Sequence, residues 1–231
     1  MTSFVPAVRE ASAGEFSIDR REALRYLGCG NAASNSPLPP EMLDLLDACE
    51  AELRAALRPR VCWARVPLRF PAPFTTDAGF GPVESVSLAK HLHGCHSALL
   101  FAATIGVEAD RLIQRWSRLR PSRGAVLDAL ASAAVESWCD AAEAELTRDL
   151  GPHCDRFSPG YGDFALQHQR DIVLCLDTPR TLGLTLTGSL LMMPSKSVTA
   201  IIGLGASART CGHRCMFCTK ENCIYREVIT P

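Results

Sequence analysis

Apolar residues in this chain repeat with two different periods, and segments of the two kinds follow one another without regular alternation. Spacing typical of helices is found in residues 39–60, 107–119 and 123–150, and in shorter stretches at 17–30, 85–92 and 166–177. Runs typical of strands occupy residues 61–70, 95–106, 182–194 and 197–205. Because regular βαβ units are missing from this order, the pattern predicts an α+β fold with a largely antiparallel twisted sheet flanked by helices.

The charge balance excludes several classes of function. The 231 residues include 24 basic and 25 acidic side chains, which gives a formal net charge of -1. A general nucleic-acid or anionic-membrane binder would carry a basic excess, so neither partner is expected. No apolar run approaches the roughly 18 residues of a spanning helix. Residues 1–20 carry acidic side chains and lack the apolar core of a secretion signal, so we expect a cytoplasmic protein.

Eleven cysteines fall into two groups. Seven are scattered among apolar residues, where a reduced cysteine behaves as a small hydrophobic side chain. The total is odd and the expected compartment is reducing, so a disulfide framework is not predicted. The scattered cysteines are Cys29, Cys49, Cys62, Cys95, Cys139, Cys154 and Cys175.

The other four cysteines lie close together near the end of the chain. Cys211, Cys215, Cys218 and Cys223 form the pattern C-x3-C-x2-C-x4-C. Thiolates at this spacing can converge on one metal centre, either tetrahedral zinc or an iron–sulfur cluster. The sequence therefore predicts a main domain over residues 1–205 and a metal-binding tail over 206–231.

A cluster of histidines near residue 93 has an ordinary explanation. The stretch KHLHGCH contains His91, His93 and His96, together with Cys95. Histidines that flank a strand are more often hydrogen-bonded structural residues than metal ligands. We therefore expect a structural role for them.

The loop 155–163, DRFSPGYGD, combines residue types that suit a zwitterionic ligand with an aromatic part. Arg156 can bind a carboxylate through two hydrogen bonds, and Tyr161 offers a flat amphipathic face. Gly160 and Gly162 allow the backbone to approach a ligand closely. The two aspartates at the ends of the loop can face a positive charge. An ordinary Pro-Gly turn with solvated charges has the same composition, so composition alone leaves both interpretations open.

Several stretches together resemble the activation domain of cobalamin-dependent methionine synthase. They are RFSPGYGD, LGLTLTGSLLMMPSKSVTAIIG, LLFAATIG and LASAAVESWCDAAEAEL, in an order and spacing similar to that of the family. The resemblance covers roughly residues 18–205. It is strongest to stand-alone proteins of this type, which also carry a cysteine-rich end.

The resemblance implies a function. Activation domains of this family bind S-adenosylmethionine (AdoMet) and present its methyl group to oxidised cobalamin, while an external donor supplies one electron. It implies reductive reactivation of a separate corrinoid methionine synthase, which supplies the cobalamin. A flavodoxin or ferredoxin would be a suitable electron donor.

The resemblance also implies which residues bind AdoMet. Arg156 matches the arginine of the family loop, and Pro159, Gly160 and Tyr161 match directly. Ser158 stands where the family has an alanine that acts mainly through its backbone. These five residues are the predicted AdoMet-binding residues.

The chain departs from the family pattern at two further positions. Phe157 replaces a proline, and Gly188 replaces the glutamate of a Leu-Thr-Glu-Ser motif. That glutamate is a natural partner for the positive charge of AdoMet. Its loss favours a second hypothesis, in which the protein is a non-catalytic docking or stabilising module for a corrinoid protein.

The resemblance gives the cysteine tail two possible roles. An iron–sulfur cluster on the four cysteines would relay the activating electron toward cobalamin. A zinc ion would instead fix the end of the chain in place. The spacing of the cysteines does not decide between them.

Overall fold

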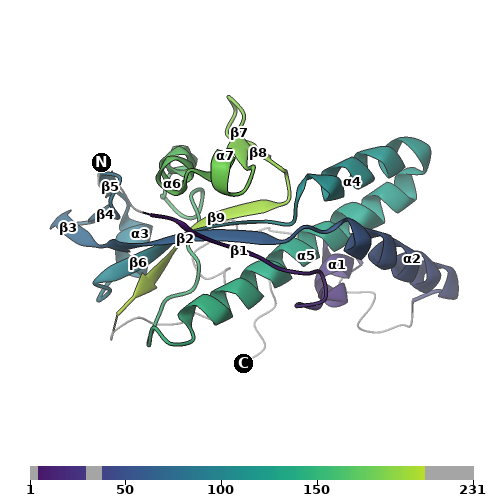
Figure 1. Ribbon diagram of the computed structural model, residues 1–231, viewed down its shortest axis with the longest axis horizontal. Helices are drawn as coiled ribbons and strands as arrows, with labels where there is room; N and C mark the ends of the chain where they lie inside the picture. The colour runs from purple at the N-terminus through teal and green to yellow at the C-terminus, as the bar shows by residue number, and fades with distance from the viewer. Residues whose placement is uncertain (1–4, 30–37, 206–231) are drawn as a thin grey trace.

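The fold is built on a four-stranded antiparallel sheet (Figure 1). The computed structural model describes residues 5–29 and 38–205. The strand order is β1-β2-β6-β9, and every neighbouring pair is antiparallel. The four strands are β1 (Ala7–Glu10), β2 (Arg60–Pro67), β6 (Ser97–Thr104) and β9 (Ser197–Leu204).

One face of this sheet is covered by four helices, which enclose the larger of two hydrophobic cores. The long helix α5 crosses the sheet and buries Trp138, whose indole N–H donates to the Arg60 carbonyl at 3.1 Å. Only Arg120 separates α4 from α5, so these two helices form a tight hairpin. The four helices are α1 (Arg20–Tyr26), α2 (Pro40–Ala56), α4 (Val107–Leu119) and α5 (Pro121–Thr147).

The opposite face is covered by shorter elements, which enclose the second core. Figure 1 shows α6 and α7 on one side of the sheet and α5 on the other. The short elements comprise a three-stranded sheet, a two-stranded hairpin, three helices and one 3-10 turn. They are β3 (Arg69–Ala72), β4 (Thr75–Asp77), β5 (Pro82–Glu84), α3 (Val86–His91), η1 (Leu166–His168), α6 (Gln169–Leu176), α7 (Thr178–Thr181), β7 (Thr185–Leu186) and β8 (Met192–Met193).

Strand β6 lies between the two cores, and all eight of its residues are buried. Leu99 and Phe101 belong to the core beneath α5, whereas Ala98 and Leu100 belong to the core on the opposite face. Successive side chains of a strand point to opposite faces, so a strand covered on both sides is apolar throughout. This explains why its sequence is a continuous apolar run rather than an alternating one.

The α+β class and the antiparallel sheet are confirmed, whereas two predicted strands differ in detail. The run at residues 61–70 divides at Leu68, because β3 joins a different sheet from β2. The run at 182–194 is not one strand. It folds back on itself at Thr187, whose backbone N–H donates to the Leu191 carbonyl at 2.9 Å. Local hydrophobicity does not reveal such a reversal, because both arms of the hairpin are apolar.

Among the residues that the structure describes, no helix is both long and apolar enough to cross a membrane.

Candidate functional site

The loop predicted to bind a ligand lies along the free edge of β9. The Cys154 N–H donates to the Gly203 carbonyl at 2.8 Å. Three residues later, Phe157 and Ile201 exchange two backbone hydrogen bonds, each of 2.9 Å. These contacts fix the backbone on both sides of Arg156, so its side chain is held in one direction.

Arg156 and Phe157 point to opposite faces of the sheet, as neighbours in an extended chain do. Phe157 lies in the core beside α6. The Arg156 guanidinium lies instead on the α5 side, 6.0 Å from the centre of the Phe101 ring. Phe157 therefore adds an aromatic side chain to the core.

Three carboxylates of α5 surround the Arg156 side chain, which is only 6% exposed. Arg156 Nη2 donates to Asp140 Oδ1 at 2.5 Å, and Nη1 donates to Glu143. Glu136 Oε2 lies 3.6 Å from Nη2. Residues 136, 140 and 143 share one helix face because they are separated by four and three positions. We call Arg156 and these three residues the arginine–carboxylate cluster.

The arginine–carboxylate cluster has more negative than positive charge. An arginine stays protonated in proteins, so one positive charge faces three carboxyl groups. Burial raises the pKa of Glu143, and the positive charge of Arg156 acts in the opposite direction. Burial raises the pKa of the Tyr26 hydroxyl, and the charges of Glu22 and of Glu136 in the cluster add to that effect. The cluster is therefore rich in carboxyl groups.

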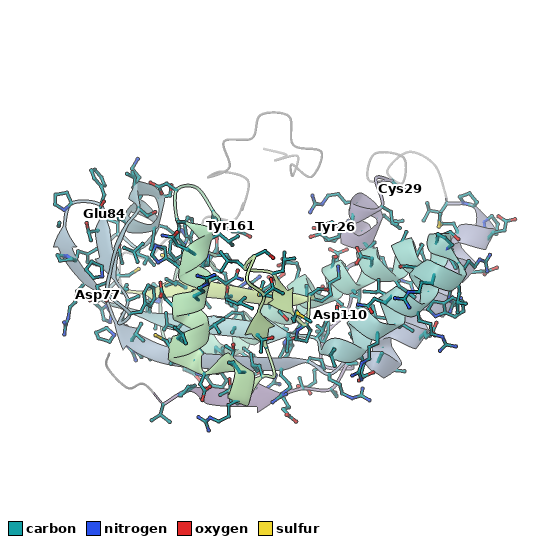
Figure 2. The ribbon with its side chains drawn as sticks, turned by 90° about the horizontal axis from the view of Figure 1, so that it is seen from above. Tyr26, Cys29, Asp77, Glu84, Asp110 and Tyr161 are labelled. Atoms are coloured by element: carbon teal, nitrogen blue, oxygen red, sulfur yellow. The ribbon has the colours of Figure 1, made fainter. Side chains whose placement is uncertain are left out.

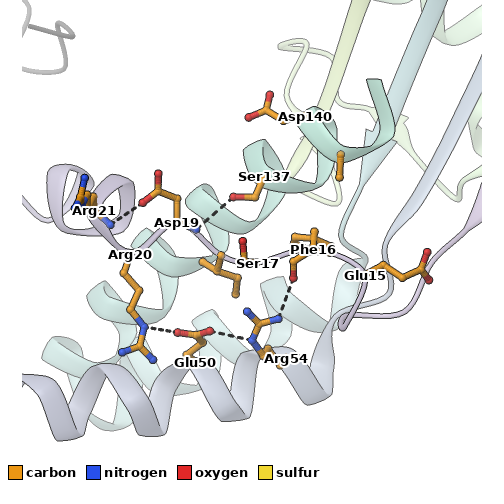
Figure 3. Close-up of a pocket in the computed structure, with 12 residues that line it drawn as sticks. Glu15, Phe16, Ser17, Asp19, Arg20, Arg21, Glu50, Arg54, Ser137 and Asp140 are labelled. Atoms are coloured by element: carbon orange, nitrogen blue, oxygen red, sulfur yellow. Dashed lines mark hydrogen bonds and ion pairs between the residues drawn. The ribbon is translucent and has the colours of Figure 1, made fainter. Parts of the chain in front are cut away.

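An open cleft of about 870 Å³ lies beside this cluster (Figure 3). Its walls are residues 15–21, α2 and α5, and Asp140 belongs both to the cleft and to the cluster. Arg20 Nε donates to Glu50 at 2.6 Å, and Glu50 also accepts from Arg54 at 2.9 Å. The cleft thus offers paired charges of both signs, and it shares Asp140 with the cluster.

The other predicted AdoMet-binding residues form a compact turn. The Ser158 carbonyl accepts from the Tyr161 N–H at 3.1 Å, and the Gly160 N–H donates to the Phe164 carbonyl at 2.7 Å. Pro159 is buried, whereas Tyr161 is 38% exposed. Figure 2 shows Tyr161 and Tyr26 along the same edge of the molecule.

Gly162 serves a close contact within the protein. Its φ is +54°, and a Cβ placed there would lie 2.4 Å from Ser87 Oγ. Only glycine permits both this backbone angle and this approach. The backbone of the loop therefore approaches α3 at Gly162, where the sequence suggested an approach to a ligand.

Asp163 joins the loop to the start of α3. Its Oδ1 accepts from Ser85 Oγ at 2.6 Å and from the Ser87 N–H at 2.9 Å, and its Oδ2 accepts from the Val86 N–H at 2.8 Å. The bond from the Ser85 hydroxyl, with the two backbone bonds, holds the pKa of Asp163 well below its usual range. This carboxylate therefore positions the loop against α3.

Replacing Asp163 by asparagine is expected to lower the melting temperature by about 2–4 °C at pH 7. Both carboxylate oxygens accept N–H or O–H groups, and an amide has only one acceptor oxygen. A depressed pKa stabilises the folded state above the pKa of the unfolded chain, near 4, and this contribution is lost as the pH falls further. Thermal unfolding of both proteins from pH 7 to pH 2 should show the difference shrinking below about pH 4. A difference in melting temperature that stays the same from pH 7 to pH 2 would contradict the lowered pKa of Asp163.

The histidine cluster contains a structural residue, as expected. His91 is buried, its Nε2 lies 2.8 Å from the Asp155 carbonyl oxygen, and its ring centre is 4.7 Å from that of Phe157. Burial lowers the pKa of the imidazole. The His91 side chain therefore packs against the loop through Asp155 and Phe157.

Gly188 lies on the exposed hairpin between β7 and β8. A Cβ at this position would have no atom within 4 Å, so a glutamate side chain would fit there without a clash. The Gly188 carbonyl accepts from Arg170 Nη2 at 3.4 Å. The acidic groups near Arg156 come from α5, and not from this hairpin.

The acidic face of α5 and the cleft were not predicted from the sequence. The spacing of Glu136, Asp140 and Glu143 was a usable signal, because it places three carboxylates on one helix face. The cleft had no local signal, since its walls come from three separate segments, at residues 15–21, 50–54 and 137–141.

The four tail cysteines, Cys211, Cys215, Cys218 and Cys223, lie outside the described residues 5–29 and 38–205. Within those ranges, no group of three or more histidine, cysteine, aspartate or glutamate side chains is arranged to hold a metal ion. Zinc and iron–sulfur binding by the tail therefore stay predictions.

Comparisons with known proteins support the fold. No protein-family model matches the sequence, and no curated protein sequence is significantly similar to it. Among solved structures, the chain is similar to the crystal structure of the MetH reactivation domain bound to AdoHcy, with a TM-score of 0.65 and 17% sequence identity. The match covers 90% of this chain and 80% of that one. The two chains share the same α+β fold.

Proposed function

We propose, from the fold shared with the MetH reactivation domain, that this protein uses AdoMet to reactivate the cobalamin of a separate corrinoid methionine synthase. The observation that carries the proposal is the arginine–carboxylate cluster at the edge of an open cleft. Support also comes from the AdoHcy bound to the structural neighbour, since AdoHcy is what AdoMet becomes after losing its methyl group.

The cleft and the cluster suit the chemical groups of AdoMet. A cleft of about 870 Å³ is within the usual size range of small-molecule sites. The carboxylates of α5 attract the sulfonium and ammonium groups of AdoMet, and the arginines of the cleft attract its carboxylate. AdoHcy has a neutral sulfur, so the cluster favours AdoMet over the product.

The proposed reaction balances with one external electron. A donor such as flavodoxin or ferredoxin reduces cob(II)alamin on the partner to cob(I)alamin. The cobalt then takes the methyl group from the sulfonium, which yields methylcobalamin and AdoHcy. The residues of this chain bind and orient AdoMet and exclude water, so their contribution is mainly positioning.

We expect AdoMet to bind about tenfold more tightly than AdoHcy, because a tenfold ratio corresponds to about 1.4 kcal/mol of favourable charge interaction. Calorimetry with both ligands at low salt measures the ratio. Asp140→Asn should reduce it, since Asp140 belongs to both cluster and cleft and its side chain is 62% exposed. Ser132→Ala, on the same helix but outside the cleft, should leave the ratio unchanged.

A second assay tests the reaction. The protein is mixed with a cobalamin-loaded methionine synthase fragment that lacks a reactivation domain, a reduced flavodoxin and methyl-labelled AdoMet. Labelled methylcobalamin that requires all four components supports the proposal. Absence of both AdoMet binding and labelling would reject it.

One observation favours the second candidate, a non-catalytic docking or stabilising module. Gly188 leaves open space where the family has a glutamate, so one expected partner for the charge of AdoMet is missing. Tight binding of the corrinoid fragment without AdoMet binding or methyl transfer would establish this alternative.

We also propose that Cys211, Cys215, Cys218 and Cys223 bind a metal centre. An iron–sulfur cluster fits the requirement for an electron, and zinc fits a purely structural role. Iron and acid-labile sulfide, measured against zinc after anaerobic purification, separate the two.

A further inference from the structure

The hairpin of α4 and α5 carries an unusual concentration of arginine. Five arginines fall within residues 111–123, and that stretch contains no acidic residue. Arg111, Arg115 and Arg118 lie on one face of α4, because they are separated by four and three positions. All three are exposed, as is Arg120 at the junction of the two helices.

Three of these arginines have no ion-pair partner among the described residues. Arg111 pairs with Glu108 at 2.5 Å, and Arg123 pairs with Glu52 at 2.7 Å. The neighbouring carboxylates, Glu108 and Glu52, therefore already form ion pairs with other arginines. Arg115, Arg118 and Arg120 form no ion pair in the part of the chain that the structure describes.

Apolar groups accompany these charges. Leu119 is 66% exposed between Arg118 and Arg120. The half-buried Trp116 ring lies 5.7 Å from the Arg115 guanidinium. Arginine and tryptophan are the residues most enriched at the energetic centres of protein–protein interfaces. This composition favours a protein partner over a lipid surface or a nucleic acid, which the overall charge of -1 also disfavours. We call Arg115, Arg118, Leu119 and Arg120 the arginine surface.

The arginine surface is far from the arginine–carboxylate cluster. Asp140 lies 20 residues along α5 from Arg120, a distance of roughly 30 Å at 1.5 Å per residue. In Figure 1, the α4–α5 hairpin ends at one extremity of the molecule, away from α6 and α7. A partner bound here is held at a second point, separate from any chemistry at the cluster.

We propose that the arginine surface docks an acidic patch on the corrinoid partner. This inference rests on the proposed function, because it concerns the protein that the chain would reactivate. Complementary charges accelerate the encounter of two proteins and orient it, and this effect weakens as salt is added. The arginine surface therefore determines the rate and affinity of partner binding, whereas the arginine–carboxylate cluster determines the binding of AdoMet.

The test uses Arg115→Glu combined with Arg118→Glu in the full chain. We expect the KM for the cobalamin-loaded methionine synthase fragment to rise about tenfold or more at low salt, with kcat and the Kd for AdoMet unchanged. The Kd for the fragment is measured directly as well, and should rise in parallel. Arg69→Glu combined with Arg148→Glu changes the net charge equally at exposed sites elsewhere, and should alter KM by less than about twofold.

Several results would overturn the docking surface. In the first, the KM and the Kd for the fragment stay the same when salt is added and when Arg115→Glu and Arg118→Glu are introduced together. Another is a dimer of the unaltered protein, seen by sedimentation equilibrium, that the same substitutions dissociate, because the occupant is then a second copy. Binding to anionic vesicles or to duplex DNA at the affinity of the fragment would also reject it. Failure of the unaltered protein to methylate a fragment that it binds counts against the proposed function instead.

Discussion

Replacing Arg156 by alanine is expected to destabilise the protein by about 3–5 kcal/mol and to abolish AdoMet binding. The Glu143 side chain is only 13% exposed and would be left without the guanidinium that bonds to it. A buried charge that loses its partner is costly, because the protein interior solvates it poorly. Urea unfolding measures the first effect, and calorimetry at a temperature where the variant is folded measures the second.

A double variant separates the two roles of Arg156. Glu143→Gln removes the unpaired charge, so Arg156→Ala/Glu143→Gln should regain most of the lost stability. It should still fail to bind AdoMet if Arg156 contacts the ligand as proposed. Recovery of AdoMet binding along with stability would show that Arg156 acts only by holding α5 in place.

Replacing Gly124 by alanine is expected to destabilise the protein by about 1–3 kcal/mol, as overpacking does. By helix propensity alone, alanine would be more stable than glycine by about 1 kcal/mol. A Cβ at position 124 would lie 2.6 Å from Ser117 Cα, however, and that atom belongs to the backbone of α4. The two helices would have to separate, because no side chain can move aside to relieve the contact.

The neighbouring residue is a matched control for this prediction. Ala125 occupies the same turn of α5 and is exposed. Ala125→Gly should cost only about 0.5–1 kcal/mol, which is the ordinary propensity difference. Thermal or urea unfolding of both variants gives the comparison. If Gly124→Ala were more stable than the unaltered protein, the close contact of α4 and α5 would be wrong.

The structure shows contacts of several loop residues that the sequence did not predict. Arg156 is predicted to bind a ligand, and in the structure it is bonded to carboxylates of α5, of which Asp140 also lines a cleft. Gly162 and Asp163 were expected near the ligand, and both contact the start of α3. Residue type predicts what a side chain can bind. Which partner it meets depends on elements far away in the sequence.

The α+β class, the main helices and the strand at residues 95–106 could be predicted from the sequence alone. Each of these follows from the period of apolar residues within one segment, which is a local property. The contact of Arg156 with Glu136, Asp140 and Glu143, and the cleft that residues 15–21 form with α2 and α5, depend on the tertiary structure. Such contacts join segments whose distance in space depends on how all the elements pack together. No local pattern of residues records that distance.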